Sequence, residues 1–111
     1  MADSPRLRQL FAFLDNKPND TFVLFALAKE YEKLGDQEKA LAYYLKLLDT
    51  DIDYVGAYYH LAKLYERKEQ PEKAFSTYKE GMDIAKKVGD KHALSELAGA
   101  KLALGDEEDF E

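Results

Sequence analysis

The chain has 111 residues, of which 46% are hydrophobic and 34% are charged, and its net charge at pH 7 is −6. The hydrophobic share is typical of one folded domain and excludes an intrinsically disordered chain, while the net negative charge argues against binding to nucleic acids or to anionic membranes. The chain has no cysteine, which excludes disulfides and thiolate metal sites.

The start of the chain, residues 1–5, has no basic flank followed by an apolar core, so we expect no secretory signal. No apolar run in the sequence is long enough to span a bilayer. We therefore expect a soluble protein of the cytoplasm, and the lack of cysteine fits that compartment.

Hydrophobic residues spaced at the helical period, together with helix-ending residues, predict six helices. Ser4 followed by Pro5 is typical of an N-cap and a first helical position. Further N-cap candidates are Asp20, Asp36, Asp53 and Asp90, and candidates for a left-handed C-terminal residue are Gly35, Gly89 and Gly105. The predicted helices lie near residues 5–15, 20–34, 36–50, 54–68, 71–88 and 90–104.

A shift of 34 residues aligns one part of the chain with another. The matched pairs include Leu27 with Leu61, Ala28 with Ala62, Tyr31 with Tyr65, Ala40 with Ala74, and Tyr44 with Tyr78. Two more residues of shift align a third, partial copy, in which Lys101 stands where the other copies have tyrosine. The predicted core stripe of that copy is Leu94, Leu97, Ala98 and Leu102.

Each full copy has a large residue, leucine, a small residue and tyrosine in one helix, then alanine and an aromatic residue in the next. The first copy reads Leu24, Leu27, Ala28, Tyr31, Ala40 and Tyr44, and the second reads Tyr58, Leu61, Ala62, Tyr65, Ala74 and Tyr78. This pattern resembles the signature of the tetratricopeptide repeat family. The resemblance implies an all-α, right-handed helical-hairpin solenoid of six helices, with about two and a half to three repeats.

The same resemblance divides the chain, taken as a single domain of residues 1–111. We expect an incomplete repeat at 1–19, repeats at 20–53 and 54–88, and a C-terminal capping half-repeat at 89–111. The last helix is predicted to act as a cap because Lys101 makes its face more polar. We expect the acidic end, residues 106–111, to fray.

In this family the first helices of successive repeats line a concave groove, so the resemblance implies a partner-binding surface there. The groove-facing residues predicted from helical spacing are Phe22, Phe25, Lys29, Lys33, Tyr59, His60, Lys63 and Arg67. Aromatic and cationic side chains favour a protein or peptide segment with apolar and acidic side chains. In the alternative interpretation, Glu32 and Glu66 neutralise the lysines, and Phe22 and Phe25 pack on the first helix of the chain.

We therefore predict a protein-interaction module, an adaptor or scaffold with no enzymatic activity and no cofactor. A second hypothesis is homo-oligomerisation, as a homodimer, through the apolar edge of the first helix. That edge carries Leu7, Leu10, Phe11, Phe13 and Leu14. A third hypothesis, a metal-binding or catalytic protein, depends on His60 and His92 alone, and these two lack a nearby third ligand, so no metal site is predicted.

Overall fold

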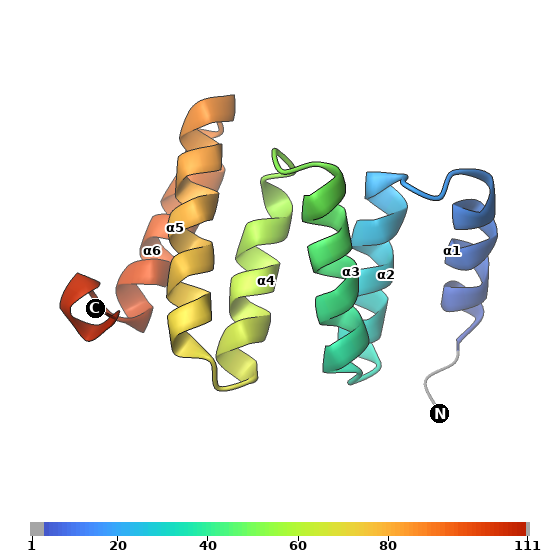
Figure 1. Ribbon diagram of the computed structural model, residues 1–111, viewed down its shortest axis with the longest axis horizontal. Coiled ribbons are helices and arrows are strands. Elements are labelled where there is room, and N and C mark those ends of the chain that lie inside the picture. The colour runs from blue at the N-terminus through green and yellow to red at the C-terminus, as the bar shows by residue number, and fades with distance from the viewer. Residues whose placement is uncertain (1–3, 111) are drawn as a thin grey trace. The chain divides into compact units, whose positions relative to one another are not determined.

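The computed structural model describes residues 4–110, and all regular structure in that range is helical (Figure 1). The elements are α1 (Pro5–Asn16), α2 (Thr21–Lys33), α3 (Gln37–Thr50), α4 (Gly56–Arg67), α5 (Pro71–Val88), α6 (Lys91–Leu104) and the 3₁₀ helix η1 (Glu107–Phe110). The all-α class and the six predicted helices are confirmed. None of the described helices combines the length and the apolar character that crossing a bilayer requires.

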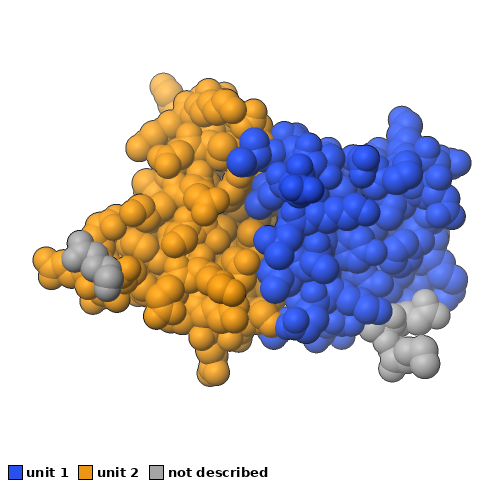
Figure 2. All heavy atoms as spheres, in the orientation of Figure 1, with its two compact units in different colours: residues 1–52 blue, residues 53–111 orange. Residues whose placement is uncertain are grey.

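The chain forms two compact units, residues 1–52 and 53–111, coloured separately in Figure 2. Unit 1 contains α1, α2 and α3, and unit 2 contains α4, α5, α6 and η1. Each unit has one helical hairpin that holds a complete copy of the 34-residue pattern. The division into repeats given above stays a prediction.

The helix starts are fixed by side chains that accept hydrogen bonds from the first turn. Ser4 Oγ accepts from the Leu7 amide at 3.1 Å, and Pro5 takes the first helical position. Three of the predicted aspartates cap their helices in the same way: Asp20, Asp36 and Asp90. Such caps satisfy amide groups that have no partner within the helix.

The N-cap predicted at Asp53 is wrong. The helix α4 begins only at Gly56, and no side chain caps it. Asp53 instead accepts from Lys87 Nζ at 3.0 Å, so its carboxylate ties the start of unit 2 to the end of α5. The predicted left-handed helix ends are confirmed at Gly35 and Gly89, where φ is +80° and +78°.

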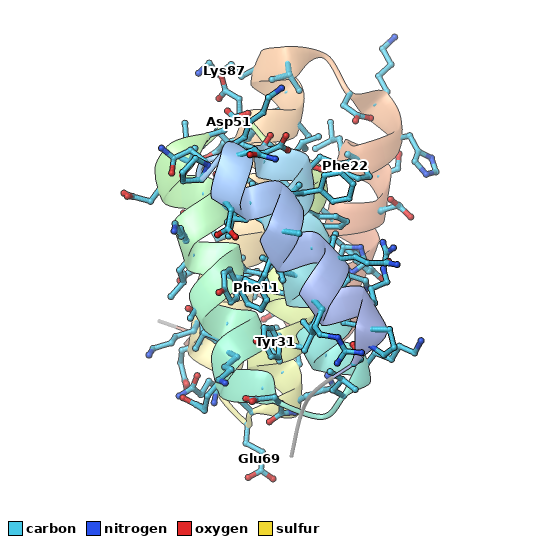
Figure 3. All side chains as sticks on the ribbon, turned by 90° about the vertical axis from the view of Figure 1, so that its right-hand side faces the viewer. Phe11, Phe22, Tyr31, Asp51, Glu69 and Lys87 are labelled. Carbon is cyan, nitrogen blue, oxygen red and sulfur yellow. The ribbon has the colours of Figure 1, made fainter. Side chains whose placement is uncertain are left out.

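The core of unit 1 contains the predicted stripe. Its buried members include Leu24, Leu27, Ala28, Tyr31, Ala40 and Tyr44. Tyr43 adds an aromatic layer: it stacks on Tyr31 with ring centroids 5.7 Å apart, and Phe11 meets its edge at 6.3 Å. Phe11 and Tyr31 are labelled in Figure 3. This layer joins α1, α2 and α3 through large apolar rings.

The core of unit 2 follows the same stripe with two differences. Tyr58, Leu61, Ala62, Ala74 and Tyr78 are buried, but Tyr65 is partly exposed, although an interior site equivalent to that of Tyr31 was expected. The reason lies at Thr77, which stands 34 residues after Tyr43. Its side chain is too short to stack on a ring, and its hydroxyl donates to the Lys73 carbonyl at 2.7 Å within α5.

The second difference is a close approach of helices at Gly81, where α5 packs between α4 and α6. A Cβ atom on Gly81 would lie 2.6 Å from the Tyr58 Cβ and 3.1 Å from a methyl carbon of Leu97. Unit 1 has Leu47 at the matching position, and Leu47 is fully buried. At this position the helices of the unit 2 hairpin approach each other closely, whereas in unit 1 the side chain of Leu47 fills the space between the helices.

Two expectations for the end of the chain are wrong. Leu102, predicted in the core, is 75% exposed, because the face of α6 that α5 covers centres on Leu97. The acidic end was expected to fray, but residues 107–110 form η1 and the Phe110 ring stacks on Phe75, while Glu111 lies outside the described residues. Periodicity could not predict this contact, because Phe75 lies in a different helix far earlier in the sequence.

Candidate functional site

The predicted site residues of unit 1 all lie on α2. Phe22 is 69% exposed, and its place near the start of α2 is labelled in Figure 3. Most of its side chain is therefore uncovered, whereas the alternative interpretation had it packed on α1. Phe25 is partly exposed and meets the ring of Tyr44 edge-on at 6.2 Å, while Lys29 and Lys33 are exposed. The face of α2 therefore presents two aromatic rings beside two cations.

A buried tyrosine, Tyr44, hydrogen-bonds to a glutamate on this face of α2. The Tyr44 hydroxyl donates a hydrogen bond to Glu32 Oε1, and Lys29 Nζ lies 4.0 Å from the same oxygen. Burial raises the pKa of the Tyr44 phenol well above its ordinary value, so the phenol remains a donor at neutral pH. Glu32 thus balances part of the charge of Lys29, as the alternative interpretation anticipated.

The predicted site residues of unit 2 all lie on α4 and show a matching arrangement. Tyr59 meets the ring of Tyr78 edge-on at 6.4 Å, and Lys63 Nζ lies 5.5 Å from the centroid of the Tyr59 ring. The Tyr78 hydroxyl donates to Glu66, and Lys63 Nζ lies 3.8 Å from the same carboxylate oxygen. Burial, followed by the hydrogen bond and the charge of Glu66, raises the pKa of Tyr78.

We call these two groups of residues the aromatic–lysine sets. The set of unit 1 is Phe25, Lys29, Glu32 and Tyr44, and the set of unit 2 is Tyr59, Lys63, Glu66 and Tyr78. In both, a buried phenol donates to a glutamate, and the lysine of the set lies within 4.0 Å of the same carboxylate oxygen.

His60 and Arg67 complete the predicted face of α4. The His60 ring meets the edge of Tyr59 at 5.8 Å, with the planes at 87°, and Arg67 is exposed in the last turn of the helix. Arg67 stands 34 residues after Lys33, so both faces carry a second cation one turn beyond the lysine of the set.

A pocket of about 200 Å³ opens in unit 2 beside His60. Its lining residues are Val55, Gly56, Tyr59, His60, Ala93, Glu96 and Leu97. Three of them are aliphatic, and Glu96 is the one carboxylate among them; its Oε1 lies 3.5 Å from Nε2 of His92. Glu96 was not among the predicted groove-facing residues. It aligns with His60 in the third copy, but the pocket itself also requires α6 to lie beside α4.

Neither histidine lies within a group of metal ligands in the described structure. Across residues 4–110 no three His, Asp or Glu side chains are placed to hold a metal ion together. His92 is largely exposed and lies beside Glu96, four residues along the same helix.

The apolar edge of α1 is mostly used inside unit 1. Leu7 and Leu10 are buried in the core, and Phe11 contacts Tyr43. Phe13 is the large apolar residue of this helix that remains well exposed, at 64%. The apolar surface predicted for self-association is therefore smaller than the sequence suggested, because α1 turns Leu7 and Leu10 toward the core of unit 1.

Comparison with known proteins gives concordant results. The tetratricopeptide repeat model matches residues 23–51 and 55–88. A tetratricopeptide repeat domain protein from Salinibacter ruber, known from a crystal structure, is 44% identical, with a TM-score of 0.73 over 83% of this chain and 99% of that chain. A solution structure of such a protein from the same organism is 45% identical, with a TM-score of 0.76 over 79% and 89% of the two chains.

More distant structures share the fold. One is PcrH in complex with the chaperone binding region of PopD, at 18% identity and a TM-score of 0.78 over 86% of this chain and 72% of that chain. Another is the type III secretion translocator chaperone SycD of Yersinia enterocolitica, at 17% identity and a TM-score of 0.77 over 86% and 66%. A search among curated proteins found no match.

Proposed function

Because the chain belongs to the tetratricopeptide repeat family, we propose that it is a protein-interaction module in which the exposed face of α2 in unit 1 and the exposed face of α4 in unit 2 each bind a segment of a partner protein. In this role it serves as an adaptor or scaffold in the cytoplasm and catalyses no reaction. The family relationship supports the general role, and the two faces supply the chemistry of the partner.

The observation that carries this proposal is the repetition of the aromatic–lysine set. The core stripe of a repeat must recur, because each hairpin has to bury the same face. The lysine and the partly exposed ring of each set are less constrained by packing than the core stripe, although each ring contacts a core tyrosine. Their recurrence at Phe25 and Lys29, and again at Tyr59 and Lys63, therefore favours a surface used twice for the same kind of contact.

The charges on these faces indicate which partner fits. Lys29, Lys33, Lys63 and Arg67 are four cations on a chain whose net charge is −6. Glu32 and Glu66 balance part of this charge, and Lys33 and Arg67 extend it toward the ends of their helices. On either face, acidic side chains of a bound segment would meet the cations. Its apolar side chains would meet Phe22 and Phe25 on α2, or Tyr59 on α4.

The pocket beside His60 suits one apolar side chain of such a segment. Val55, Ala93 and Leu97 give it an aliphatic lining, and its volume of about 200 Å³ is enough for a leucine-sized group. PcrH, which shares the fold, is known in complex with the chaperone binding region of PopD, and this likeness supports segment binding by analogy.

A peptide selection tests the proposal. The wild-type protein would be panned against a library of random twelve-residue peptides, and we expect the bound sequences to be enriched in acidic and apolar residues. The double variant Lys33→Glu/Arg67→Glu should bind the selected peptides at least tenfold more weakly, and Phe25→Ala/Tyr59→Ala should weaken them as well.

The matched control is Lys17→Glu/Lys46→Glu, which changes the net charge equally at exposed positions outside the two faces. Binding by this control should equal that of the wild type. Peptides that bind all four proteins equally would disprove the use of these faces.

Self-association through α1 is a second candidate, favoured by the 64% exposure of Phe13. Light scattering over a range of concentrations would then show a dimer for the wild type and a monomer for Phe13→Asp. A wild type that remains a monomer at every concentration eliminates this candidate.

A further inference from the structure

A second surface of unit 2 carries a short segment of the chain itself. The 3₁₀ helix η1 follows α6 and lies at the C-terminal end of the described chain (Figure 1). Its last residue, Phe110, stacks on Phe75 of α5 with ring centroids 4.4 Å apart and planes at 19°. Phe75 is buried, so the ring of Phe110 forms part of what covers it.

Two lysines surround the same ring and hold a carboxylate of the segment. Lys101 Nζ lies 4.7 Å from the centroid of Phe75, and Lys79 Nζ lies 5.8 Å from it. The carboxylate of Glu107 lies 3.2 Å from Lys79 Nζ and 3.7 Å from Lys101 Nζ. A carboxylate and an aromatic ring three residues apart thus bind one compact surface, which we call the acceptor surface and define as Phe75, Lys79 and Lys101.

The acceptor surface is not a general feature of the repeat. The first copy has Leu41 and Leu45 where the second has Phe75 and Lys79, and Lys101 replaces the tyrosine of the signature. Beside it lies a hollow of about 280 Å³, lined by Lys79, Met82, Asp83, Lys86, Lys101 and Glu107. Two of its three lysines, Lys79 and Lys101, already pair with Glu107.

The segment that covers the acceptor surface, η1, is short and follows α6 through Gly105. At its start, the Asp106 amide donates to Asp109 Oδ2 at 3.0 Å, and the Asp109 amide donates to the Asp106 carbonyl at 3.0 Å. It follows Gly105, where a Cβ atom would lie 2.8 Å from Phe110 Cε2. A four-residue helix with two anchoring side chains has few contacts to break, so it opens at a low free-energy cost.

We propose that the acceptor surface is a second binding site, specific for partner segments that carry a carboxylate three residues before an aromatic ring, and that Glu107–Phe110 occupies it within the same chain. A tethered segment has an effective concentration on the order of millimolar, so a free segment of equal affinity competes poorly until the tethered one is removed. The site is independent of the faces of α2 and α4.

The test uses the labelled peptide Gly-Asp-Glu-Glu-Asp-Phe, which copies residues 105–110, and follows its fluorescence anisotropy. We expect the variant Glu107→Ala/Phe110→Ala to bind this peptide at least tenfold more tightly than the wild type does. Adding Lys79→Glu/Lys101→Glu should abolish binding, and so should replacing the phenylalanine of the peptide by alanine. The proposal is overturned if the Glu107→Ala/Phe110→Ala variant has the circular dichroism spectrum of a folded protein and yet binds the peptide no more tightly than the wild type.

A measurement on the wild type keeps the proposal testable if that variant does not fold. In amide NMR spectra, a large excess of the peptide should displace the tethered segment and move the signals of residues 106–110 toward unstructured positions. The alanine-substituted peptide should leave these signals in place. Signals that stay unchanged with both peptides would show that η1 is only a structural cap.

Discussion

The hairpins of the two units share one sequence pattern and fill their interiors in different ways. In unit 1, Tyr43 stacks on Tyr31, and Leu47 is fully buried. In unit 2, the matching positions hold Thr77 and Gly81, and the backbone of α5 approaches Tyr58 closely. A repeat pattern therefore prescribes which positions face inward, whereas the sizes of paired residues decide how closely the helices approach.

The largest expected effect of a single substitution tests the close approach of helices in unit 2. Gly81→Ala should lower the free energy of unfolding by about 1–3 kcal/mol, because the added Cβ overlaps the Cβ of Tyr58. The control is Gly99→Ala in α6, where a Cβ meets nothing within 4 Å, and it should stabilise by roughly 0.5–1 kcal/mol. Denaturant unfolding measures both, and equal stability of the two variants would contradict the packing difference.

Alkaline pH should lower the folding stability of both units because each has a buried phenol, Tyr44 in unit 1 and Tyr78 in unit 2. Tyr44 and Tyr78 have pKa values raised above the ordinary 10.0, so above pH 10 the unfolded chain releases protons that the folded chain retains. Stability is therefore complete below pH 10 and falls above it, by roughly 1.4 kcal/mol per pH unit for each phenol.

Denaturant unfolding from pH 9 to pH 11.5 measures this fall. Tyr44→Phe and Tyr78→Phe should each reduce its slope, and a wild type whose stability is constant over this range would rule out the raised pKa values. Comparing the two variants shows whether the phenol of unit 1 or that of unit 2 contributes more.

The aromatic layer of unit 1 can be tested by replacing Tyr43 with threonine, the residue at the matching position of unit 2. Tyr43→Thr should cost roughly 1–2 kcal/mol, because a stacked or edge-on aromatic pair contributes roughly 0.5–1.5 kcal/mol beyond the area it buries. Tyr43→Phe retains the rings facing Tyr31 and Phe11 and should change the melting temperature little. If the threonine and phenylalanine variants have the same melting temperature, the aromatic layer does not contribute to the difference in packing between the two units.

The smallest expected effect compares two aspartates near helix starts. Asp36→Ala removes the cap of α3 and should cost about 1 kcal/mol. Asp53→Ala removes a largely exposed ion pair with Lys87 and should cost about 0–0.5 kcal/mol. Thermal unfolding monitored by circular dichroism separates the two, and a larger loss at Asp53 would restore the capping role predicted from the sequence.

Much of the candidate site follows from local spacing. Phe25, Lys29, Tyr59 and Lys63 were predicted on one face of their helices because a helix of known core stripe has a known opposite face. The pocket at Glu96 was missed because it needs α4 and α6 side by side. The phenol–glutamate bonds were missed for a similar reason, since each joins two helices of a hairpin.

The sequence by itself determined the helices, their caps at Asp20, Asp36 and Asp90, and the residues that face inward in the first full repeat. These features depend on hydrogen bonds and spacings within a few residues, which the sequence order states directly. Only the tertiary structure decided the partial exposure of Tyr65, the pairing of Asp53 with Lys87, and the docking of Phe110 on Phe75. Each depends on a side chain from another helix, and which distant groups meet depends on their sizes and charges after the helices have packed.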